Sequence, residues 1–363
     1  MKKQKVLIVG PIPQPITGVS LANKVVLENL IKNNNFDVAS INTSLNRFDE
    51  KIGAFSFYKL FFYLKLNIYS YKIFNSDIVY ITPGQTFFGV LKYMLFILLS
   101  KLLGKELIIH VHGNFLGKQY ELLTGLKKKI FYWLLKKTSK GIVLSESLKT
   151  NMSSFIDEHQ IFVCYNFVED FLFPEKKHID EKSKQDTLKI VYLSNLMEEK
   201  GILDFLESLV LLEKRNISYE AKIAGSIESS NKSKCEAYFK KLKNTKYCGV
   251  VKGKEKRDLL LWSNIFVLPT YYSMEGQPIS ILEAMATGNI ILTTAHSGIP
   301  DIFIDKINGF YIEKQNPESI VVVLESLKSN TNLQKIREQN YNEAKQKYRV
   351  KTFIENIESI FAA

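Results

Sequence analysis

Short apolar runs alternate with longer amphipathic runs along almost the whole chain, and this alternation is what most constrains its fold. An apolar run of strand length, bounded by turn residues, is typical of a buried strand, and the amphipathic run after it is typical of a covering helix. The strand-length runs lie at residues 6–9, 77–82, 107–111, 141–144, 189–193, 219–223, 247–251, 265–268, 290–293 and 309–312. Repeated βα units build parallel sheets, so the sequence predicts an α/β protein.

The chain has 363 residues, more than a typical single domain, and a polar, charged stretch separates two sets of βα units. We therefore predict an N-terminal Rossmann-like domain over residues 1–170, a linker over 171–186 and a C-terminal Rossmann-like domain over 187–340. A C-terminal helix is predicted over 341–363. The simplest architecture consistent with this pattern is two doubly wound domains that face a cleft. Ligands are then expected to bind beyond the carboxyl ends of the strands.

The cysteines and the apolar segments point to the cytoplasm. Cys164, Cys235 and Cys248 are an odd number without CxxC spacing, which argues against a disulfide framework or a zinc site. The apolar run within residues 1–10 is of strand length, too short for the core of a signal peptide. Lysines interrupt the apolar stretch 87–103, so we expect a helix of the first domain there and no membrane-spanning segment.

The most specific motif is Tyr271–Gly288, which reads YYSMEGQPISILEAMATG. Glu275 and Glu283 bracket a Gly-Gln-Pro turn that leads into a short predicted helix, with Ser280 as its predicted N-cap and Glu283 in its first turn. Free N–H groups at a helix start attract phosphate, and carboxylates accept hydrogen bonds from sugar or ribose hydroxyls. The motif therefore predicts a sugar-nucleotide site, with Glu283 on the ribose and Glu275 on the transferred sugar.

An alternative interpretation makes Glu283 a complement to the helix dipole and Glu275 a solvated loop charge. A resemblance favours the first interpretation. The spacing Glu-x7-Glu followed by Ala-Met-Ala-x-Gly resembles the signature of glycosyltransferase family 4, which comprises retaining enzymes of the two-domain GT-B architecture and includes bacterial O-antigen and capsule glycosyltransferases. It implies a final helix that crosses back to the first domain. It also implies donor contacts from Gly276, Gln277, Pro278, Ile279, Ser280 and Glu283.

Two further loops resemble donor-binding elements of that family. Residues 10–20 follow the first predicted strand and end in Gly18 before a helix, where the family places backbone against the donor diphosphate; the alternative is a glycine that only makes a turn. Lys200 precedes a predicted helix, and the resemblance implies that its ammonium neutralises the diphosphate, although a surface lysine is usually just solvated. Asn195 stands where the family usually has an arginine, so it offers only a neutral hydrogen bond.

His110 and His112 end a first-domain strand, and alternation places both on one face. Two histidines suggest a metal site, but no third ligand is evident nearby. The resemblance implies that His112 lies near the donor sugar. A histidine packed in the core is the alternative.

Glycosyl transfer requires stabilisation of an oxocarbenium-like centre and of the departing diphosphate. Lys200 and the loop amides are predicted to stabilise the diphosphate, and Glu275 and His112 to orient the sugar. Since no second carboxylate is placed as a nucleophile, the resemblance implies a front-face reaction that retains configuration. No DxD-like metal motif is apparent, so we expect no cofactor and little dependence on divalent metal.

Basic and aromatic residues concentrate in the first domain. Residues 51–150 carry 15 Lys or Arg against 4 Asp or Glu, within a formal net charge of +12. Residues 54–74 and 125–137 mix aromatics with lysines, which suits helices at an anionic membrane surface. A core helix with a solvated basic face is the alternative, and nucleic-acid binding is not favoured because no recognised module accompanies the charge.

The sequence thus predicts a cytoplasmic enzyme, peripheral on the inner face of the membrane, that moves a sugar to a polyprenyl-diphosphate-linked glycan during bacterial surface-polysaccharide assembly. A UDP-sugar is the first expectation for the donor and GDP-mannose the second. Two alternatives stay open: a phosphorylase or epimerase of the same fold, and a catalytically silent nucleotide- or membrane-binding protein. The sequence does not identify the donor sugar, the acceptor, the linkage or the oligomeric state.

Overall fold

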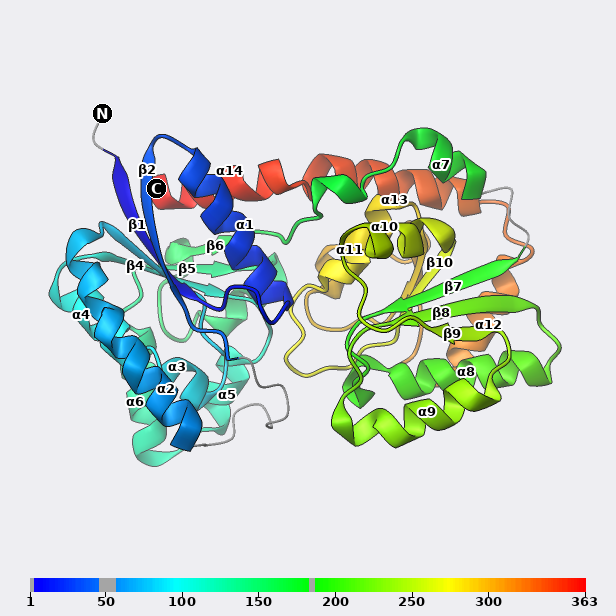
Figure 1. Cartoon of the computed structure of the whole chain (residues 1–363), viewed down its shortest axis with the longest axis horizontal. Helices are drawn as coiled ribbons and strands as arrows, with labels where there is room; N and C mark the ends of the chain where they lie inside the picture. The colour runs from blue at the N-terminus through cyan, green and yellow to red at the C-terminus, as the bar shows by residue number, and fades with distance from the viewer. Residues whose placement is uncertain (1–2, 46–56, 183–186) are drawn as a thin grey trace. The chain divides into compact units, whose positions relative to one another are not determined.

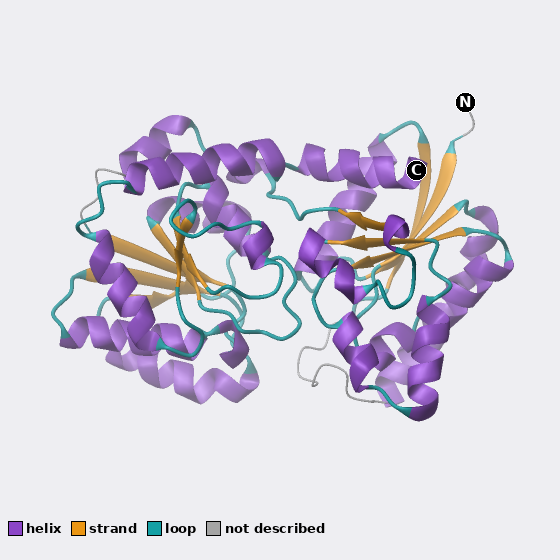
Figure 2. Cartoon of the chain, turned by 180° about the vertical axis from the view of Figure 1, so that it is seen from behind, coloured by secondary structure: helices purple, strands orange, loops and turns teal. Residues whose placement is uncertain are grey.

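The structure is a computed structural model that describes residues 3–45, 57–182 and 187–363. The chain divides into two compact units, each with one parallel sheet and helices on both of its faces (Figures 1 and 2). The first unit comprises Met1–Asn166 and Phe353–Ala363, and the second comprises Phe167–Thr352. The predicted α/β class with two doubly wound Rossmann-like domains is confirmed.

In the described part of the first unit, six parallel strands form one sheet in the order β2-β1-β3-β4-β5-β6. The strands are β1 (Gln4–Gly10), β2 (Phe36–Asn42), β3 (Ile78–Ile81), β4 (Glu106–Val111), β5 (Lys140–Val143) and β6 (Ile161–Val163). The helices are α1 (Gly18–Lys32), α2 (Phe57–Leu66), the 3-10 helix η1 (Asn67–Asn75), α3 (Phe87–Leu91), α4 (Met94–Leu102), α5 (Leu116–Leu122), α6 (Gly125–Leu135) and most of α14 (Val350–Ala362). The central strands are buried on both faces, which explains their continuous apolar sequence.

The second unit repeats this plan. Its described strands form a six-stranded parallel sheet in the order β12-β11-β10-β7-β8-β9. They are β7 (Leu188–Leu193), β8 (Tyr219–Ala224), β9 (Thr245–Tyr247), β10 (Ile265–Leu268), β11 (Ile290–Thr293) and β12 (Gly309–Tyr311). The helices are α7 (Lys176–Lys182), α8 (Ile202–Lys214), α9 (Lys232–Lys241), α10 (Gly253–Trp262), α11 (Ile279–Ala286), α12 (Pro317–Leu327) and α13 (Leu333–Lys347).

The C-terminal residues 341–363 are not one helix. They comprise the end of α13 and all of α14, and the break falls at Tyr348 and Arg349. At the break, the Tyr348 carbonyl accepts a hydrogen bond of 2.7 Å from the Val168 amide, and the Arg349 guanidinium contacts Asp170 at 2.9 Å. The chain therefore leaves the second unit beside the point at which it enters.

The end of α14 packs within the first unit. The Phe361 ring lies edge-on to Phe36 and Tyr80, with ring centroids 6.3 and 5.8 Å apart. Asn33 also donates a hydrogen bond of 2.8 Å to Glu358. The last residues of the chain thus complete the core built by the first.

Other elements lie outside the predicted pattern. β2 and β6 are edge strands that the apolar runs did not indicate. α7 lies inside the segment 171–186 that the sequence predicts as a linker, and its Ile179 is buried. Among the described residues, no helix combines the length and apolar character that crossing a bilayer requires.

In each sheet the strand order reverses direction beside one strand. β7 pairs with β8 on one side and with β10 on the other, and β1 lies in the same way between β2 and β3. Successive connections run in opposite directions from these strands, which opens a crevice at the carboxyl ends where ligands of doubly wound sheets bind. The loops after β7 and β10 are therefore the first place to look for a site in the second unit.

Gly201 lets these two loops approach closely. Its φ of +75° lies in the left-handed region, and an added Cβ would lie only 2.3 Å from the carbonyl oxygen of Pro269, which follows β10. A side chain at this position would therefore strain the backbone and also separate the loops.

We predict that Gly201→Ala lowers the free energy of unfolding by about 2–4 kcal/mol, because left-handed strain and overpacking add. Gly249→Ala is the matched control. Gly249 has a φ of +70° with no atom near an added Cβ, so its variant should lose only about 1–2 kcal/mol. Urea unfolding of both variants measures the difference, and equal losses would contradict the close approach.

Candidate functional site

Lys200 and Glu275 meet beyond the carboxyl ends of β7 and β10. Lys200 ends the 3-10 turn η5 (Glu198–Lys200), and its ammonium lies 2.5 Å from Glu275 Oε2. The two side chains are only 14% and 8% exposed, so the ion pair is largely buried. Thr270 donates a further hydrogen bond of 3.1 Å to Glu275 Oε2. The two residues that the sequence assigns to the diphosphate and to the sugar are therefore in direct contact.

Backbone and aromatic contacts hold the Lys200 turn in place. The Tyr192 hydroxyl donates to the Lys200 carbonyl at 3.2 Å, and the Tyr271 amide donates to the Glu199 carbonyl at 2.8 Å. The Lys200 ammonium also lies 5.0 Å from the centre of the Tyr272 ring. The position of the ammonium is thus fixed by both loops.

The loop that carries Glu275 is also held from behind. The Ser297 hydroxyl donates a hydrogen bond to the Glu275 carbonyl, and the Gly298 amide donates to the Gly276 carbonyl at 3.1 Å. Ser297 itself has a positive φ of 54°, so a constrained turn provides this support. The local sequence around Ser297 gives no indication of this role.

The start of α11 differs from the prediction in two respects. The helix begins at Ile279, so Pro278 is the N-cap residue and Ser280 lies inside the first turn; the predicted Ser280 cap is wrong. The prediction that Glu283 lies in the first turn is also wrong, because it is the fifth helical residue. Proline supplies a fixed φ at the cap instead of a side-chain hydrogen bond. The first-turn amides of Ile279 and Ser280 have no intrahelical acceptor and are open to a ligand.

Glu283 lies in a buried charge cluster that the sequence did not predict. Its Oε1 is 2.5 Å from the ammonium of Lys256 on α10, and the same ammonium lies 3.2 Å from Glu169 Oε2. The Glu283 and Lys256 side chains are 5% and 13% exposed. One lysine therefore balances two carboxylates, one of which follows the entry of the chain into the second unit.

Burial and neighbouring charges shift the pKa values in this cluster. Burial raises the pKa of Glu283, Lys256 opposes the rise, and the charge of Glu169 adds to it. Burial alone would lower the pKa of Lys256, but Glu283 and Glu169 raise it above the usual value. Lys256 therefore stays protonated, and the Glu283 carboxylate depends on it.

A sequence signal for Lys256 exists. Lys256, Leu259 and Leu260 recur at the spacing of one helical face, and both leucines are buried. A charged residue on the apolar face of a helix needs a buried partner, which is what Glu283 provides.

Gly18 is the first residue of α1 and so belongs to the helix, whereas the sequence predicts it at the end of the preceding loop. The helix is capped by Thr17, whose side chain accepts from the Ser20 amide at 3.1 Å while the Ser20 hydroxyl accepts from the Thr17 amide at 2.8 Å. This capping box fixes the helix start and leaves Gly18 exposed to solvent.

His110 and His112 stack on each other with ring centroids 3.9 Å apart. The Tyr80 hydroxyl lies 2.6 Å from His110 Nδ1, so His110 belongs to the packed core. Burial lowers the pKa of His112 to about 3, which keeps its ring neutral. His112 Nε2 is buried without a hydrogen-bond partner among the described residues. His110 Nε2 is likewise buried without a partner among the described residues, so each ring keeps one nitrogen unused.

The predicted site residues thus fall into three groups. Lys200, Glu275 and the loop residues Gly276, Gln277 and Pro278 lie together at the carboxyl edge of the second sheet, with Ile279 and Ser280 leading into α11 and to Glu283. The Asn195 side chain is exposed and forms no hydrogen bond or ion pair in the described structure, while its carbonyl accepts a hydrogen bond from the Tyr192 hydroxyl. Gly18 and His112 belong to the first unit.

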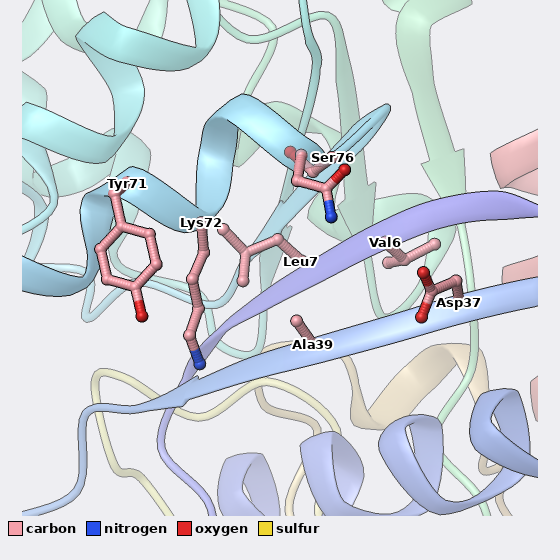
Figure 3. Close-up of a pocket in the computed structure, with 8 residues that line it drawn as sticks. Val6, Leu7, Asp37, Ala39, Tyr71, Lys72 and Ser76 are labelled. Carbon is pink, nitrogen blue, oxygen red and sulfur yellow. The ribbon is translucent and has the colours of Figure 1, made fainter.

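One cavity of the first unit lies away from all of these residues. It has a volume of about 210 Å³ and is lined by residues of β1, β2 and η1, including Asp37 and Lys72 (Figure 3). Among the described residues, no group of three or more His, Cys, Asp or Glu side chains is arranged to hold a metal ion. Independence of metal remains a prediction.

Comparison with known proteins identifies related sequences and structures. Residues 174–347 match the family of glycosyl transferases group 1. An uncharacterized glycosyltransferase of Methanocaldococcus jannaschii is 26% identical over 323 residues, which cover 84% of this chain and 78% of that protein. The capsular polysaccharide biosynthesis glycosyltransferase CapM of Staphylococcus aureus is 25% identical over 264 residues, 68% of each chain.

The fold is also similar to solved structures. A crystal structure of Anabaena HepE in complex with UDP and glucose superimposes with a TM-score of 0.72 at 14% sequence identity, covering 99% of this chain and 100% of that one. At this identity the likeness concerns the fold, which is GT-B. The matched residues 174–347 lie in the second unit, and the motifs of the candidate site at Lys200, Glu275 and Glu283 all lie within them.

We predict that Lys256→Met lowers the free energy of unfolding by about 3–5 kcal/mol, because it leaves Glu283 buried without a counter-charge. Glu283→Gln should cost less, about 1–3 kcal/mol, since Lys256 keeps Glu169. Part of the loss in Lys256→Met should be recovered between about pH 7 and pH 5. A buried carboxyl with a raised pKa destabilises the fold when it ionises, and this penalty disappears as falling pH protonates it.

Urea unfolding at several pH values tests this prediction. Lys254→Met, at an exposed position of the same helix, is the control and should change stability little. A larger loss in Glu283→Gln than in Lys256→Met would contradict the described charge balance.

Proposed function

We propose that this glycosyltransferase moves a sugar from a UDP-sugar to a lipid-linked glycan in surface-polysaccharide assembly. The configuration at the transferred sugar is retained. In this proposal the chain is a member of glycosyltransferase family 4 and acts without a cofactor or a divalent metal. The observation that carries it is the buried Lys200–Glu275 pair beyond the carboxyl ends of β7 and β10.

The pair suits a substrate with an anionic part beside a polyhydroxyl part. Before the donor binds, Glu275 neutralises the Lys200 ammonium and so avoids an unpaired buried cation. A donor diphosphate beside Lys200 attracts the ammonium, while the hydroxyls of the donor sugar donate hydrogen bonds to Glu275. The open amides of Ile279 and Ser280 contribute partial positive charge to the same diphosphate.

Catalysis follows from the charge that develops on the leaving group. As the bond between the anomeric carbon and the phosphate oxygen breaks, negative charge grows on the diphosphate, and Lys200 stabilises it more strongly than it stabilises the ground state. The same phosphate oxygen then accepts the proton of the acceptor hydroxyl, which attacks from the face that the leaving group vacates. Configuration is retained without a covalent intermediate on the protein. The neutral His112 ring offers a hydrogen bond to the sugar.

Glu283 is the proposed ribose ligand. A carboxylate accepts both vicinal hydroxyls of a ribose only while it is ionised. Lys256 maintains that ionisation despite burial, so α10 takes part in nucleotide binding through α11. The likeness to the fold of HepE, whose structure contains UDP and glucose, supports uracil as the base.

The acceptor part of the proposal is based on the surface of the first unit. Phe61, Ile68 and Phe74 on α2 and η1 are 69%, 69% and 64% exposed, and lysines accompany them along these helices. On α6, Leu126 and Trp133 are also exposed, while Phe131, Leu134 and Leu135 of the same helix are buried. Residues 54–56 of the predicted segment lie outside the described residues.

These helices combine a core face with an exposed apolar and basic face. Such a composition favours peripheral attachment to an anionic bilayer, where a polyprenyl-linked acceptor resides. The likeness to CapM, named for capsular polysaccharide biosynthesis, supports a role in the assembly of a surface polysaccharide. The proposed location is the cytoplasmic face of the membrane.

We predict that UDP raises the free energy of unfolding by about 2.7 kcal/mol at about 100 times its dissociation constant, and that GDP, ADP and CMP do not at the same concentration. Thermal unfolding measures this shift. Glu283→Ala should abolish it by removing the ribose acceptor. Lys200→Met should reduce the turnover of a UDP-sugar, followed as UDP release in EDTA, by about 10²–10³-fold because the leaving group loses its cation.

Glu255→Ala and Lys234→Met, at exposed positions of α10 and α9, are the matched controls and should leave binding and turnover unchanged. Stabilisation by UDP without any turnover would favour the catalytically silent alternative, in keeping with Asn195 in place of an arginine. Phosphate-dependent release of sugar from a glycan would favour a phosphorylase. Activity that requires Mn²⁺ would overturn the assignment of leaving-group stabilisation to Lys200.

For the membrane, we predict that the protein co-sediments with vesicles rich in anionic lipid at low salt and is released at high salt, because lysines contribute electrostatically. The double variant Phe61→Ser/Ile68→Ser should bind at least about 10-fold more weakly, since two exposed apolar side chains no longer enter the interface. A double variant on the second unit, Val250→Ser/Val322→Ser, removes exposed apolar groups elsewhere and should bind normally. Equal binding by neutral and anionic vesicles would contradict the role of the lysines.

A further inference from the structure

A second cavity lies at the amino ends of the strands of the sheet in the second unit. It has a volume of about 500 Å³, within the range of about 300–1,000 Å³ typical of small-molecule sites. Leu188, Ile265 and Ile290 line it, and each of these is the first residue of its strand. Lys200 and Glu275 follow the carboxyl ends of the same strands, and four to six residues of strand span about 13–20 Å. The cavity is therefore distinct from the proposed donor site.

Arg337 on α13 lines this cavity and is only 4% exposed. Within the described residues its guanidinium makes no hydrogen bond or ion pair, and its Nε is buried without a partner. The carboxylates of Asp180 and Glu338 accept hydrogen bonds from Gln334 instead. The Nε donor of this arginine is therefore buried and unpaired, which is an expensive arrangement unless a ligand supplies an acceptor.

A second cation lines the same cavity. Lys182, at the end of α7, is 2% exposed and donates one hydrogen bond of 2.8 Å to the Leu260 carbonyl. Burial and the charge of Arg337 both lower the pKa of Lys182, which is the expected result when no anion lies between them. A bound anion would raise this pKa again, and the ammonium then has two further donors for it.

We propose that this cavity binds the phosphoryl group of a phosphate monoester between Arg337 and Lys182. A phosphate monoester carries about −1.5 to −2 charges near neutral pH, so it matches two cations, whereas one carboxylate would leave one cation unbalanced. The guanidinium fork matches two phosphoryl oxygens in one plane. The apolar residues at the strand starts and the polar side chains of Asn330 and Thr331 then contact the remainder of the ligand.

The position of Arg337 is well defined, which favours a preformed site. Asn340 lies one helical turn further along α13 and donates 2.8 Å hydrogen bonds to the carbonyls of Asn289 and Asn308. These contacts tie the helix to the loops before β11 and β12. The guanidinium therefore requires little ordering before it binds an anion.

Isothermal titration of the full chain with glycerol 3-phosphate tests the proposal, with UDP at a saturating concentration and constant ionic strength. UDP occupies the proposed donor site, so the result does not depend on whether that proposal holds. We expect saturable binding of glycerol 3-phosphate, competition by inorganic phosphate and no binding of glycerol. Arg337→Met should weaken binding by about 30-fold or more, as is typical when one member of a buried charge pair is removed.

Lys335→Met, on the exposed face of the same helix, is the matched control and should bind like the unmodified protein. Lys182→Met is a second variant in case Arg337→Met does not fold, and it should also weaken binding. Saturable binding that persists equally in Arg337→Met and Lys182→Met would overturn the proposal. The absence of saturable binding in saturating UDP would also overturn it. If binding then appears only when UDP is left out, the phosphate belongs to the donor site.

Discussion

The pairing of β7 with β10 is the contact on which the candidate site depends. Lys200 and Glu275 are 75 residues apart in the sequence, yet they meet because the two strands are neighbours in one parallel sheet and end at the same edge. Gly201 permits the loops beyond those ends to touch at Pro269, so the ammonium reaches the carboxylate without a longer loop. The strand order thus brings the two loops together, and the side chains on these loops form the site. The two strands flank a topological switch point, from which successive connections run to opposite sides of the sheet and leave a crevice between the loops.

Burial of charge is the second constraint, and it explains why carboxylates and lysines occur in pairs here. Removal of an ion from water costs several kcal/mol, and only a close counter-charge offsets that cost. Lys200 has Glu275, and Lys256 has Glu283 and Glu169. In the proposed mechanism these pairs hold charged groups ready in a site with little water. An arriving diphosphate then exchanges one favourable partner of Lys200 for another, so the cation is never left without compensation.

The sequence predicts the regular part of this structure better than its details. Residues 265–268 and 290–293 form strands at the predicted bounds because both are short apolar runs with turn residues on each side. β2 was missed because most of its side chains are partly exposed at the edge of the sheet, so Phe36–Asn42 lacks a continuous apolar run. The start of α11 was misplaced because Ser280 is the usual type of N-cap residue, whereas here Pro278 fills that place. The partners of Glu283 could not be predicted from local patterns, since they come from α10 and from Glu169, far away in sequence.

A buried cation can reach a low free energy in three ways: by pairing with a carboxylate, by releasing its proton, or by binding an anion from solution. Lys256 is compensated by carboxylates. Lys182 has a strongly lowered pKa, so it can release its proton. Arg337 has neither option: within the described structure it has no carboxylate partner, and burial lowers its pKa only to about 10, so it stays charged near neutral pH. The remaining way is an anion from solution. The proposed anion site lies at the amino ends of the strands, at the opposite end of the sheet from the proposed donor site.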